Sequence, residues 1–367
     1  MSSQRLSEIV LVGGGHTHAL VLNALKKEPL ENTRVTVINP ETHAPYSGML
    51  PGFVAGHYSR EELDIDLQSL SERVGAELVV GKAVSIDLQG KIVQLEDQRK
   101  ISYDLSSIDI GITSRMHALR GFSEYAVPAK PLGVFSSQWD CFRNSDKPKH
   151  VAVIGGGIAG AELSMAMAYA LRSASTDFSV KLLDRGQILS DSSAKTQARV
   201  CAELLANDVE LLETVDVVEV TPEGVNFANG SRLTANFVVG AAGATPHAWL
   251  KDTELKTHNG FIEVDNTLQS SDKSVFAVGD CAHMTFDPRP KAGVYAVRQA
   301  PLLLRNLRNA INQTALETYE PQSDYLKLVS LGGKRAFGEK SGFGLSGTLV
   351  WKLKNHIDKT FMNQFQL

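Results

Sequence analysis

Two short, uninterrupted apolar runs dominate the hydrophobic pattern of the chain, Ile9–Val12 and Val151–Ile154. Each is followed by three glycines and then by a stretch rich in helix-forming residues. Uninterrupted apolar runs of this length are typical of strands that are buried on both faces of a parallel sheet. The pattern therefore predicts two βαβ units, one at the start and one in the middle of the chain.

The pattern that follows each glycine turn is similar in the two halves. The first half predicts a helix at 18–27, a strand at 34–38, antiparallel strands at 77–84, 91–95 and 100–103, and a buried strand at 106–111. The second half predicts a helix at 159–172, a strand at 180–184, antiparallel strands at 215–220 and 224–227, and an apolar strand at 236–243. Residues 42–52 predict an irregular loop, and 116–149 a proline-bearing connector. The repeated order indicates two domains of common architecture.

Both glycine turns have the spacing of nucleotide-binding turns. In such a turn the first glycine bends the chain, the second lets the backbone approach a pyrophosphate, and the third lets helix and strand pack closely. The N–H groups of the helix N-terminus then face the anion. The second turn fills all three places, with Gly155, Gly157 and Gly160. The first turn has Gly13 and Gly15 but His18 in the third place, where it either holds the helix off the strand or points at the ligand.

Composition and charge exclude several classes of protein. The chain is 43% hydrophobic and 21% charged, as in globular proteins, and its net charge of −4 gives no reason to expect a nucleic-acid partner. No apolar run approaches the ~18 residues of a membrane span, and the first strand starts too early for a signal peptide. We therefore expect a cytoplasmic location, with the cytoplasmic face of the inner membrane as the alternative. Cys141, Cys201 and Cys281 form no closely spaced pair, which argues against a metal site, an iron–sulfur cluster or a redox-active disulfide.

A third signature completes the pattern, because Ser274–Ala282 reads as a strand that ends in Gly279 and Asp280. Together with the two glycine turns, in this order, it resembles the flavoproteins with two dinucleotide-binding domains, and within them the type II NADH dehydrogenases and sulfide:quinone reductases. The resemblance covers nearly the whole chain. Three stretches more narrowly resemble the FAD-dependent oxidoreductase domain found fused to selenide, water dikinase: Gly13–His18, Pro45–Gly52 and Gly332–Phe361.

The resemblance implies an α/β fold with two Rossmann-like domains of the glutathione-reductase type. It implies an FAD-binding domain at 1–115 and 264–322, an NAD(P)H-binding domain at 116–263, and a C-terminal segment at 323–367. The implied chemistry is hydride transfer from NADH to FAD, followed by electron delivery to a quinone or another small acceptor. Two alternatives stay open, namely oxidation of sulfide or selenium compounds and a non-enzymatic role as a flavoprotein redox sensor.

The resemblance also implies which residues bind FAD. They lie at the first glycine turn, at strand ends, in the 42–52 loop and at the third signature: Gly13, Gly15, His16, Asn39, Tyr46, Ser47, Gly48, Val84, Gly111, Gly279, Asp280 and Gly293. Asp280 would accept a hydrogen bond from a ribityl hydroxyl. Asn39 stands where many FAD proteins have a ribose-binding glutamate, and Glu41 is the alternative. His16 either bonds a phosphate or relays a proton near the flavin, or it is a polar helix start that meets solvent.

The implied residues for NAD(P)H lie in the second half: Gly155, Gly157, Gly160, Asp184 and Gly243. An acid such as Asp184 suits the free 2′-hydroxyl of NADH, whereas the adjacent Arg185 can receive the 2′-phosphate of NADPH. We expect NADH, with NADPH as the alternative.

Two residues are candidates for catalytic roles. Glu162 follows the third glycine of the second turn, and the resemblance places it near nicotinamide and flavin, where it would orient the nicotinamide or relay a proton. The alternative for Glu162 is a solvated glutamate favoured by the helix dipole. Lys291 precedes a predicted helix whose positive N-terminus would face the flavin and stabilise its reduced form. Val294 and Arg298 replace two glutamines that type II dehydrogenases show near the quinone.

The C-terminal residues 347–367 predict an amphipathic helix bordered by lysines. Its apolar positions are Trp351, Leu353, Ile357, Phe361, Met362 and Phe365, and its basic ones include Lys352, Lys354 and Lys359. Such a helix either lies on an anionic membrane or docks on the core of the protein or on a second copy in a homodimer.

Overall fold

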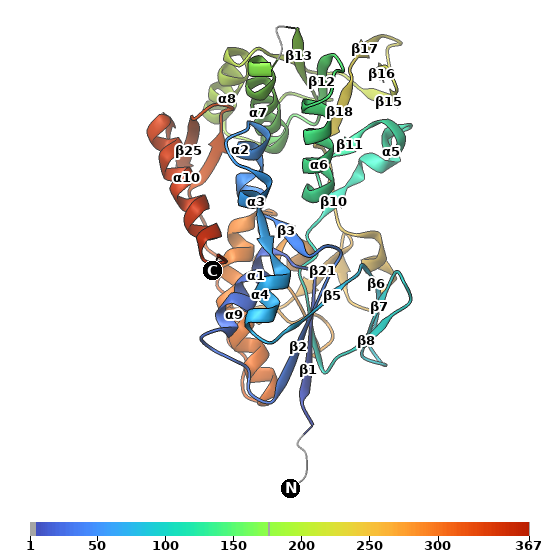
Figure 1. Ribbon diagram of the computed structural model, residues 1–367, viewed down its shortest axis with the longest axis vertical. Coiled ribbons are helices and arrows are strands. Elements are labelled where there is room, and N and C mark those ends of the chain that lie inside the picture. The colour runs from blue at the N-terminus through green and yellow to red at the C-terminus, as the bar shows by residue number, and fades with distance from the viewer. Residues whose placement is uncertain (1–4, 175–176, 367) are drawn as a thin grey trace.

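Two lobes, each built on a five-stranded parallel sheet, make up the part of the chain that the computed structural model describes, residues 5–174 and 177–366 (Figure 1). The first sheet has the order β22-β9-β1-β2-β5. Its strands are β1 (Ser7–Val12), β2 (Thr33–Asn39), β5 (Glu77–Val80), β9 (Leu105–Ile108) and β22 (Val275–Ala277). The second sheet has the order β11-β18-β12-β13-β14. Its strands are β11 (Val127–Pro128), β12 (Lys149–Ile154), β13 (Phe178–Leu183), β14 (Val209–Leu212) and β18 (Phe237–Gly240). Both predicted βαβ units are confirmed.

Burial of the central strands on both faces explains the uninterrupted apolar runs. Each side chain of Ile9–Val12 is 1% exposed, and Val151–Val153 are equally buried. Helices and antiparallel strands provide the cover (Figure 1). The helices are α1 (His16–Leu25), α4 (Leu67–Arg73) and α9 (Gly293–Ile311) in the first lobe, and α6 (Leu132–Arg143), α7 (Ile158–Ala174) and α8 (Ala194–Ala206) in the second. The strands are β6 (Ala83–Asp87), β7 (Ile92–Leu95) and β8 (Lys100–Ser102) in the first lobe, and β15 (Val217–Thr221), β16 (Gly224–Phe227) and β17 (Arg232–Thr234) in the second.

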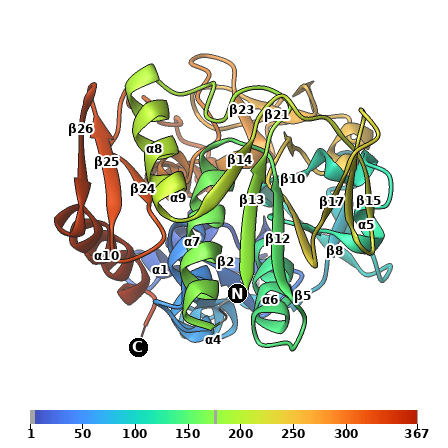
Figure 2. The same ribbon diagram turned by 90° about the horizontal axis from the view of Figure 1, so that it is seen from above.

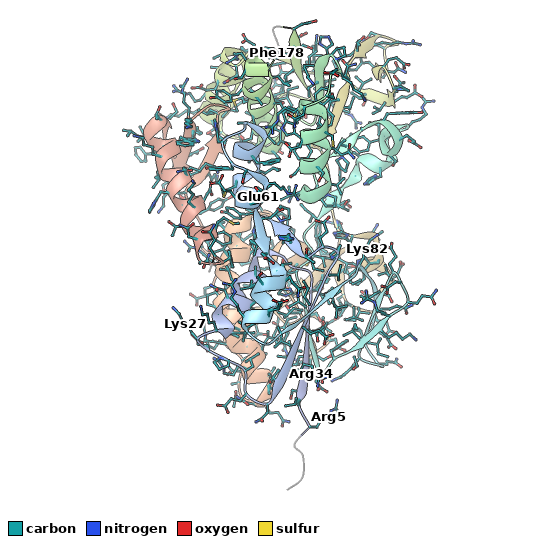
Figure 3. The ribbon with its side chains drawn as sticks, viewed as in Figure 1. Arg5, Lys27, Arg34, Glu61, Lys82 and Phe178 are labelled. Atoms are coloured by element: carbon teal, nitrogen blue, oxygen red, sulfur yellow. The ribbon has the colours of Figure 1, made fainter. Side chains whose placement is uncertain are left out.

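The carboxyl ends of the strands in the two sheets face each other. Arg34, near the start of β2, lies toward the bottom of the first lobe, and Phe178, which begins β13, lies at the top of the second (Figure 3). Because both sheets are parallel, the amino ends of their strands lie at opposite poles and the carboxyl ends meet at the junction of the lobes. Open α/β sheets bind ligands at the carboxyl ends of their strands, so the junction is the place for a site.

Three local predictions are wrong. Residues 42–52 contain β3 (His43–Pro45) and most of α2 (Leu50–Val54), because Pro51 lies in the first helical turn, where its missing N–H costs nothing. Most of the 77–84 segment is not antiparallel, because residues 77–80 form β5, the parallel edge strand of the first sheet, and antiparallel pairing begins only at Ala83 in β6. The 116–149 connector contains the 12-residue helix α6, which begins directly after Pro131.

Short elements join the two lobes and extend the first. They are α3 (Arg60–Leu63), β4 (Asp64–Asp66), β20 (Thr257–His258), β21 (Phe261–Val264) and β23 (Ala282–Met284), while the short helix α5 (Phe122–Tyr125) packs on the second lobe beside β15. The chain passes between the lobes at β10 (Thr113–Ser114) and β19 (Ala244–Thr245), which pair antiparallel.

The C-terminal segment forms a three-stranded antiparallel sheet and a helix. These are β24 (Lys327–Ser330), β25 (Ala336–Lys340), β26 (Phe343–Gly347) and α10 (Thr348–Asn363). The sheet stands at one edge of the molecule beside α8 (Figure 2), and α10 runs from the second lobe down toward the first (Figure 1). Across the described ranges, none of the helices combines the length and the apolar character that crossing a membrane requires.

Candidate functional site

The first glycine turn, Gly13–Gly15, forms a cradle between β1 and α1 that only glycine fits. A Cβ at Gly13 would lie 2.3 Å from the carbonyl oxygen of Asp109, and one at Gly14 would lie 2.2 Å from Cδ1 of Leu67. The Gly14 N–H donates to Oδ1 of Asn39 at 2.9 Å, so the amide at the end of β2 holds the turn in place. We call this turn the first cradle.

The second cradle, Gly155–Gly157, repeats this arrangement in the other lobe. Here Oδ2 of Asp184 at the end of β13 accepts the Gly156 N–H at 2.6 Å, as Asn39 accepts that of Gly14. A Cβ at Gly157 would meet nothing within 4 Å, so the middle of the second cradle is open. The same backbone plan therefore presents two glycine cradles across the junction, of which the second is open at its middle glycine position.

His18 does not point at a ligand. Its side chain is buried between α1 and the sheet, with Nδ1 2.7 Å from the carbonyl oxygen of Gly13 and Nε2 2.8 Å from Oγ of Ser107. Burial lowers the pKa of His18 to about 4, so the ring is neutral at physiological pH. His18 thus joins α1 to the first cradle and to β9, and its ring occupies the space between helix and strand that a glycine at this place would let the helix close.

Asp109 is a site residue that the sequence patterns missed. It follows β9, is 3% exposed, and its Oδ2 accepts the N–H groups of Thr17 at 2.9 Å and His18 at 3.2 Å. Burial, helped by the nearby charge of Asp280 and opposed by the hydrogen bonds from His18 and Thr17, raises the pKa of Asp109 to about 7. The only sequence signal was a carboxylate at the end of a buried strand beside a glycine turn.

Asp280, at the third signature, has a cation partner that was also missed. Nζ of Lys130 lies 3.2 Å from Oδ2 of Asp280. Desolvation lowers the pKa of His16 to about 4, with Asp280 opposing the shift and Lys130 adding to it. A Cβ at Gly293, the first residue of α9, would lie 3.5 Å from Nδ1 of His16. The structure thus brings together predicted residues from α1, η4 (Gly279–Cys281) and α9.

The loop that carries Tyr46, Ser47 and Gly48 is covered by α10. Nζ of Lys354 donates to the carbonyl of Gly48 and to Oδ2 of Asp358, both at 2.6 Å. The Tyr46 hydroxyl donates to the other oxygen of Asp358 at 3.3 Å. The Tyr46 and Phe361 rings stack with centroids 4.4 Å apart. One face of α10 is therefore docked on the protein's own site loop.

The rings of His16, Tyr46 and Phe361 form one group, which we call the aromatic cluster. The His16 ring centroid lies 5.2 Å from that of Tyr46 and 5.9 Å from that of Phe361. The cluster joins the first cradle to the C-terminal helix.

Glu162 is not a solvated helix-start residue. Its Oε1 accepts the backbone N–H of Ser330 in β24 at 2.6 Å. Burial raises the pKa of Glu162, and the charge of Lys354 opposes that rise. Glu162 thus links the start of α7 to the C-terminal segment.

Lys291 and Val84 complete the set of predicted residues. Nζ of Lys291 donates to the carbonyl of Ala282 and lies 4.2 Å from the Phe261 ring centroid, and burial lowers its pKa. Val84 lies in β6, just beyond the carboxyl end of β5. Gly111 and Gly243 occupy equivalent loops with φ of 68° and 70°.

Comparison with known proteins places this geometry among redox proteins. The sequence profile described as pyridine nucleotide-disulphide oxidoreductase matches residues 7–300. The NADH dehydrogenase-like protein YutJ of Bacillus subtilis (strain 168) is 24% identical over 373 residues, covering 96% of this chain and 99% of YutJ.

Two solved structures share the fold over most of their length. The sulfide:quinone oxidoreductase from the hyperthermophilic bacterium Aquifex aeolicus has a TM-score of 0.80 at 17% identity, covering 98% of this chain and 91% of that one. NDH2 from Plasmodium falciparum, in complex with NADH, has a TM-score of 0.80 at 14% identity, covering 98% of each chain.

Proposed function

Because this chain belongs to the pyridine nucleotide-disulphide oxidoreductase family and is a flavin-dependent oxidoreductase, we propose that it passes a hydride from NADH to FAD and then electrons to a quinone. The observation that carries the proposal is the pair of cradles at the carboxyl ends of two facing parallel sheets. One cradle would hold each dinucleotide, so that nicotinamide and flavin meet at the junction of the lobes. Bound FAD would supply the hydride acceptor.

The first cradle fits FAD. Its glycines keep Cβ atoms away from the turn, so that the backbone could come close to a pyrophosphate at the start of α1, where Asp109 now accepts the N–H groups of Thr17 and His18. Asp280, held by Lys130, would accept from the ribityl hydroxyls, and Asn39 or Glu41 would contact the ribose. We assign 1–115 and 264–322 to FAD, 116–263 to NAD(P)H, and 323–367 to the acceptor side.

The second cradle favours NADH over NADPH. Both oxygens of Asp184 are fixed by backbone N–H groups, at 2.6 Å from Gly156 and 2.7 Å from Gly186. A fixed carboxylate at this place accepts from the free 2′-hydroxyl and repels a 2′-phosphate. Arg185 is paired with Asp216 at 2.9 Å rather than turned toward Asp184.

The aromatic cluster supports a flat, apolar acceptor such as a quinone. Tyr46 and Phe361 lie beside His16, and the buried Lys354–Asp358 pair lies behind them. Stacking on aromatic rings and a nearby proton source suit the two-electron, two-proton reduction of a quinone.

Exposed apolar side chains on the outer face of the C-terminal segment support contact with a membrane, where quinones dissolve. Phe343 is 83% exposed on β26, where Leu345 is exposed two residues on, and Leu349 is 80% exposed on α10, where Leu353 and Ile357 follow at four-residue spacing. Lys352 and Lys359 are exposed on the same helix, whereas Lys354 is buried, and exposed lysines suit an anionic lipid surface. We therefore propose a peripheral position on the cytoplasmic face of the membrane, with a homodimer contact as the alternative.

Anaerobic reduction of the purified holoprotein tests the proposal. We expect a yellow protein whose flavin absorbance is bleached by NADH, more slowly by NADPH, and restored by a soluble quinone. If no pyridine nucleotide bleaches the flavin, the proposal is wrong. Faster bleaching by sulfide or selenide would favour oxidation of sulfur or selenium compounds, the chemistry that the narrower resemblance leaves open.

A further inference from the structure

The two cradles can be compared residue by residue because their strands pair in the same register. Ile108 of β9 pairs with Val12 before the first cradle, and Gly240 of β18 pairs with Ile154 before the second. Asp109 therefore occupies the position of Ala241. The second cradle, with Ala241 at this position, therefore shows the same turn without a carboxylate.

The carboxylate fills the part of the first cradle that is open in the second. A Cβ at Gly15 would lie 2.4 Å from each oxygen of Asp109, whereas one at the equivalent Gly157 would meet nothing within 4 Å. A Cβ at Gly279, in the third signature, would also lie 2.4 Å from Oδ1 of Asp109. Asp109 thus lies between two glycine turns that are expected to contact FAD.

Asp109 also occupies donors that a diphosphate needs. The first N–H groups of a helix have no partner within the helix and are the usual anion donors. In α1 the N–H groups of Thr17 and His18 already donate to Oδ2 of Asp109. A diphosphate arriving here would bring two negative charges beside a buried carboxylate.

We propose that Asp109 makes FAD binding proton-linked: its carboxylate takes up one proton from solvent when the FAD diphosphate enters the first cradle, so FAD is held less tightly as the pH rises. This inference rests on the proposed function, since it takes FAD as the ligand of the first cradle. Protonation removes the repulsion and leaves one Asp109 oxygen free to accept from α1 and the other to donate to a phosphate oxygen.

Within residues 5–174 and 177–366, no cation forms a salt bridge with Asp109. Asp280 and the thiol of Cys281 face it from η4, and Asp280 raises its pKa. His18 on α1 is held neutral by burial. Lys130 is paired with Asp280. These neighbours favour the protonated form of Asp109 over the ion.

Lys291 and His16 are the other titratable groups near this part of the cradle. Lys291 donates to the carbonyl of Ala282, and its charge acts on Asp280 and Cys281. Desolvation keeps the pKa of His16 low. We assign proton uptake on FAD binding to Asp109, since uptake by His16, whose pKa a diphosphate would also raise, would survive in both Asp109 variants described below.

The sign of the pH effect follows from the pKa of Asp109. Without FAD that pKa is about 7, and the diphosphate charge moves it upward. Below pH ~7 Asp109 is already protonated, so the affinity for FAD is flat. Above pH ~7 binding takes up a proton, and the dissociation constant rises by up to about tenfold per pH unit.

The test measures how much FAD the purified full-length protein releases on dilution, from the fluorescence of free FAD, between about pH 6 and pH 9. For the wild type we expect a dissociation constant that is flat at low pH and then rises by about tenfold or more. Asp109→Asn should abolish the rise and bind FAD about tenfold more tightly than wild type at pH 9. Asp109→Ala, which introduces the residue found at the equivalent position of the second cradle, should also abolish the rise. It controls for effects that are specific to the asparagine side chain.

Asp104→Asn is the matched control, because Asp104 lies on the same segment but pairs at the surface with Arg5. It should keep the wild-type pH dependence. A flat wild-type curve, or a rise that survives in both Asp109 variants, would overturn the proposal. Failure of NADH to bleach the flavin would instead overturn the proposed function while leaving the pH dependence of FAD release intact.

Discussion

The third place of the glycine turn shows how one residue sets the spacing of a helix and a strand. A Cβ at Gly160 would lie 1.9 Å from the carbonyl oxygen of Gly155, so α7 packs directly on its turn. In the first lobe His18 holds a ring nitrogen 2.7 Å from the equivalent carbonyl, that of Gly13. The carbonyl of Gly155 thus packs against the backbone of Gly160, whereas the equivalent carbonyl of Gly13 contacts the imidazole of His18.

We expect Gly160→Ala to lower stability and Gly157→Ala to weaken NADH binding. Gly160→Ala forces α7 off its turn and should lower the free energy of unfolding by about 1–3 kcal/mol. Gly157→Ala meets no atom within 4 Å, so stability should change little. Its methyl group would instead occupy the second cradle and raise the KM for NADH by about tenfold or more, because the backbone can no longer approach the pyrophosphate.

Denaturant unfolding and NADH titration of the two variants separate these effects. If Gly160→Ala and Gly157→Ala lost the same amount of stability, the close packing of α7 on the carbonyl of Gly155 would not be the reason for a glycine at position 160.

Individual site residues were predictable where a local motif fixes them. The glycines and Asp280 follow directly from their turns. Lys130 was not predictable, because it meets Asp280 only when the connector folds across the junction. The sequence predicts Asp109 as part of an apolar strand, since no local pattern marks a buried carboxylate that accepts hydrogen bonds from the start of another helix.

At the scale of elements, α10 is held by a buried ion pair. The side chains of Lys354 and Asp358 are 10% and 6% exposed, and they lie one turn apart on the face that meets Tyr46 and Gly48. Removing one partner of such a pair leaves a buried charge, whereas replacing both with apolar groups is often tolerated.

Asp358→Asn should therefore loosen α10 and cost about 3 kcal/mol or more of stability, because Lys354 loses its counter-charge. The double variant Lys354→Met with Asp358→Leu should recover most of that loss. Thermal unfolding with proteolysis of the C-terminal helix measures both. An Asp358→Asn variant as stable as the wild type would show that the pair does not hold the helix.

Elements were predictable in proportion to their burial. β1 and β12 were found because burial on both faces demands an uninterrupted apolar run. In the edge strand β5 only Val79 is buried, so its sequence lacks the uninterrupted apolar run of a central strand and predicts antiparallel pairing instead. α6 was hidden by Pro131, which ends regular structure in most contexts but here precedes the helix.

At the scale of the whole molecule, the exposed apolar face of β26 and α10 is the feature that bears on location. Replacing Phe343 and Leu349 together with glutamine should weaken binding to anionic lipid vesicles by about tenfold, because each side chain would otherwise leave water for the bilayer interface. Tyr125→Gln is the matched control, since Tyr125 is 50% exposed on α5, which lies at the opposite edge of the molecule from α10 (Figure 1). Vesicle flotation measures the binding.

Two outcomes would contradict the membrane contact. One is wild-type protein that stays unbound at every vesicle concentration. The other is a homodimer in solution that the same double substitution dissociates, which would identify the face as a subunit interface.

The C-terminal segment also ties the lobes to each other. Arg335 forms a salt bridge with Glu203 on α8 in the second lobe at 2.9 Å, and Nζ of Lys354 donates to the carbonyl of Gly48, which belongs to the first half of the chain, at 2.6 Å. Two-domain enzymes can close and open by rotation of their domains about a hinge, and a segment that contacts both lobes resists that rotation. Removing the chain from β24 onward would therefore do more than shorten the protein, because the contacts that this segment makes with both lobes would be lost and the lobes could rotate relative to each other.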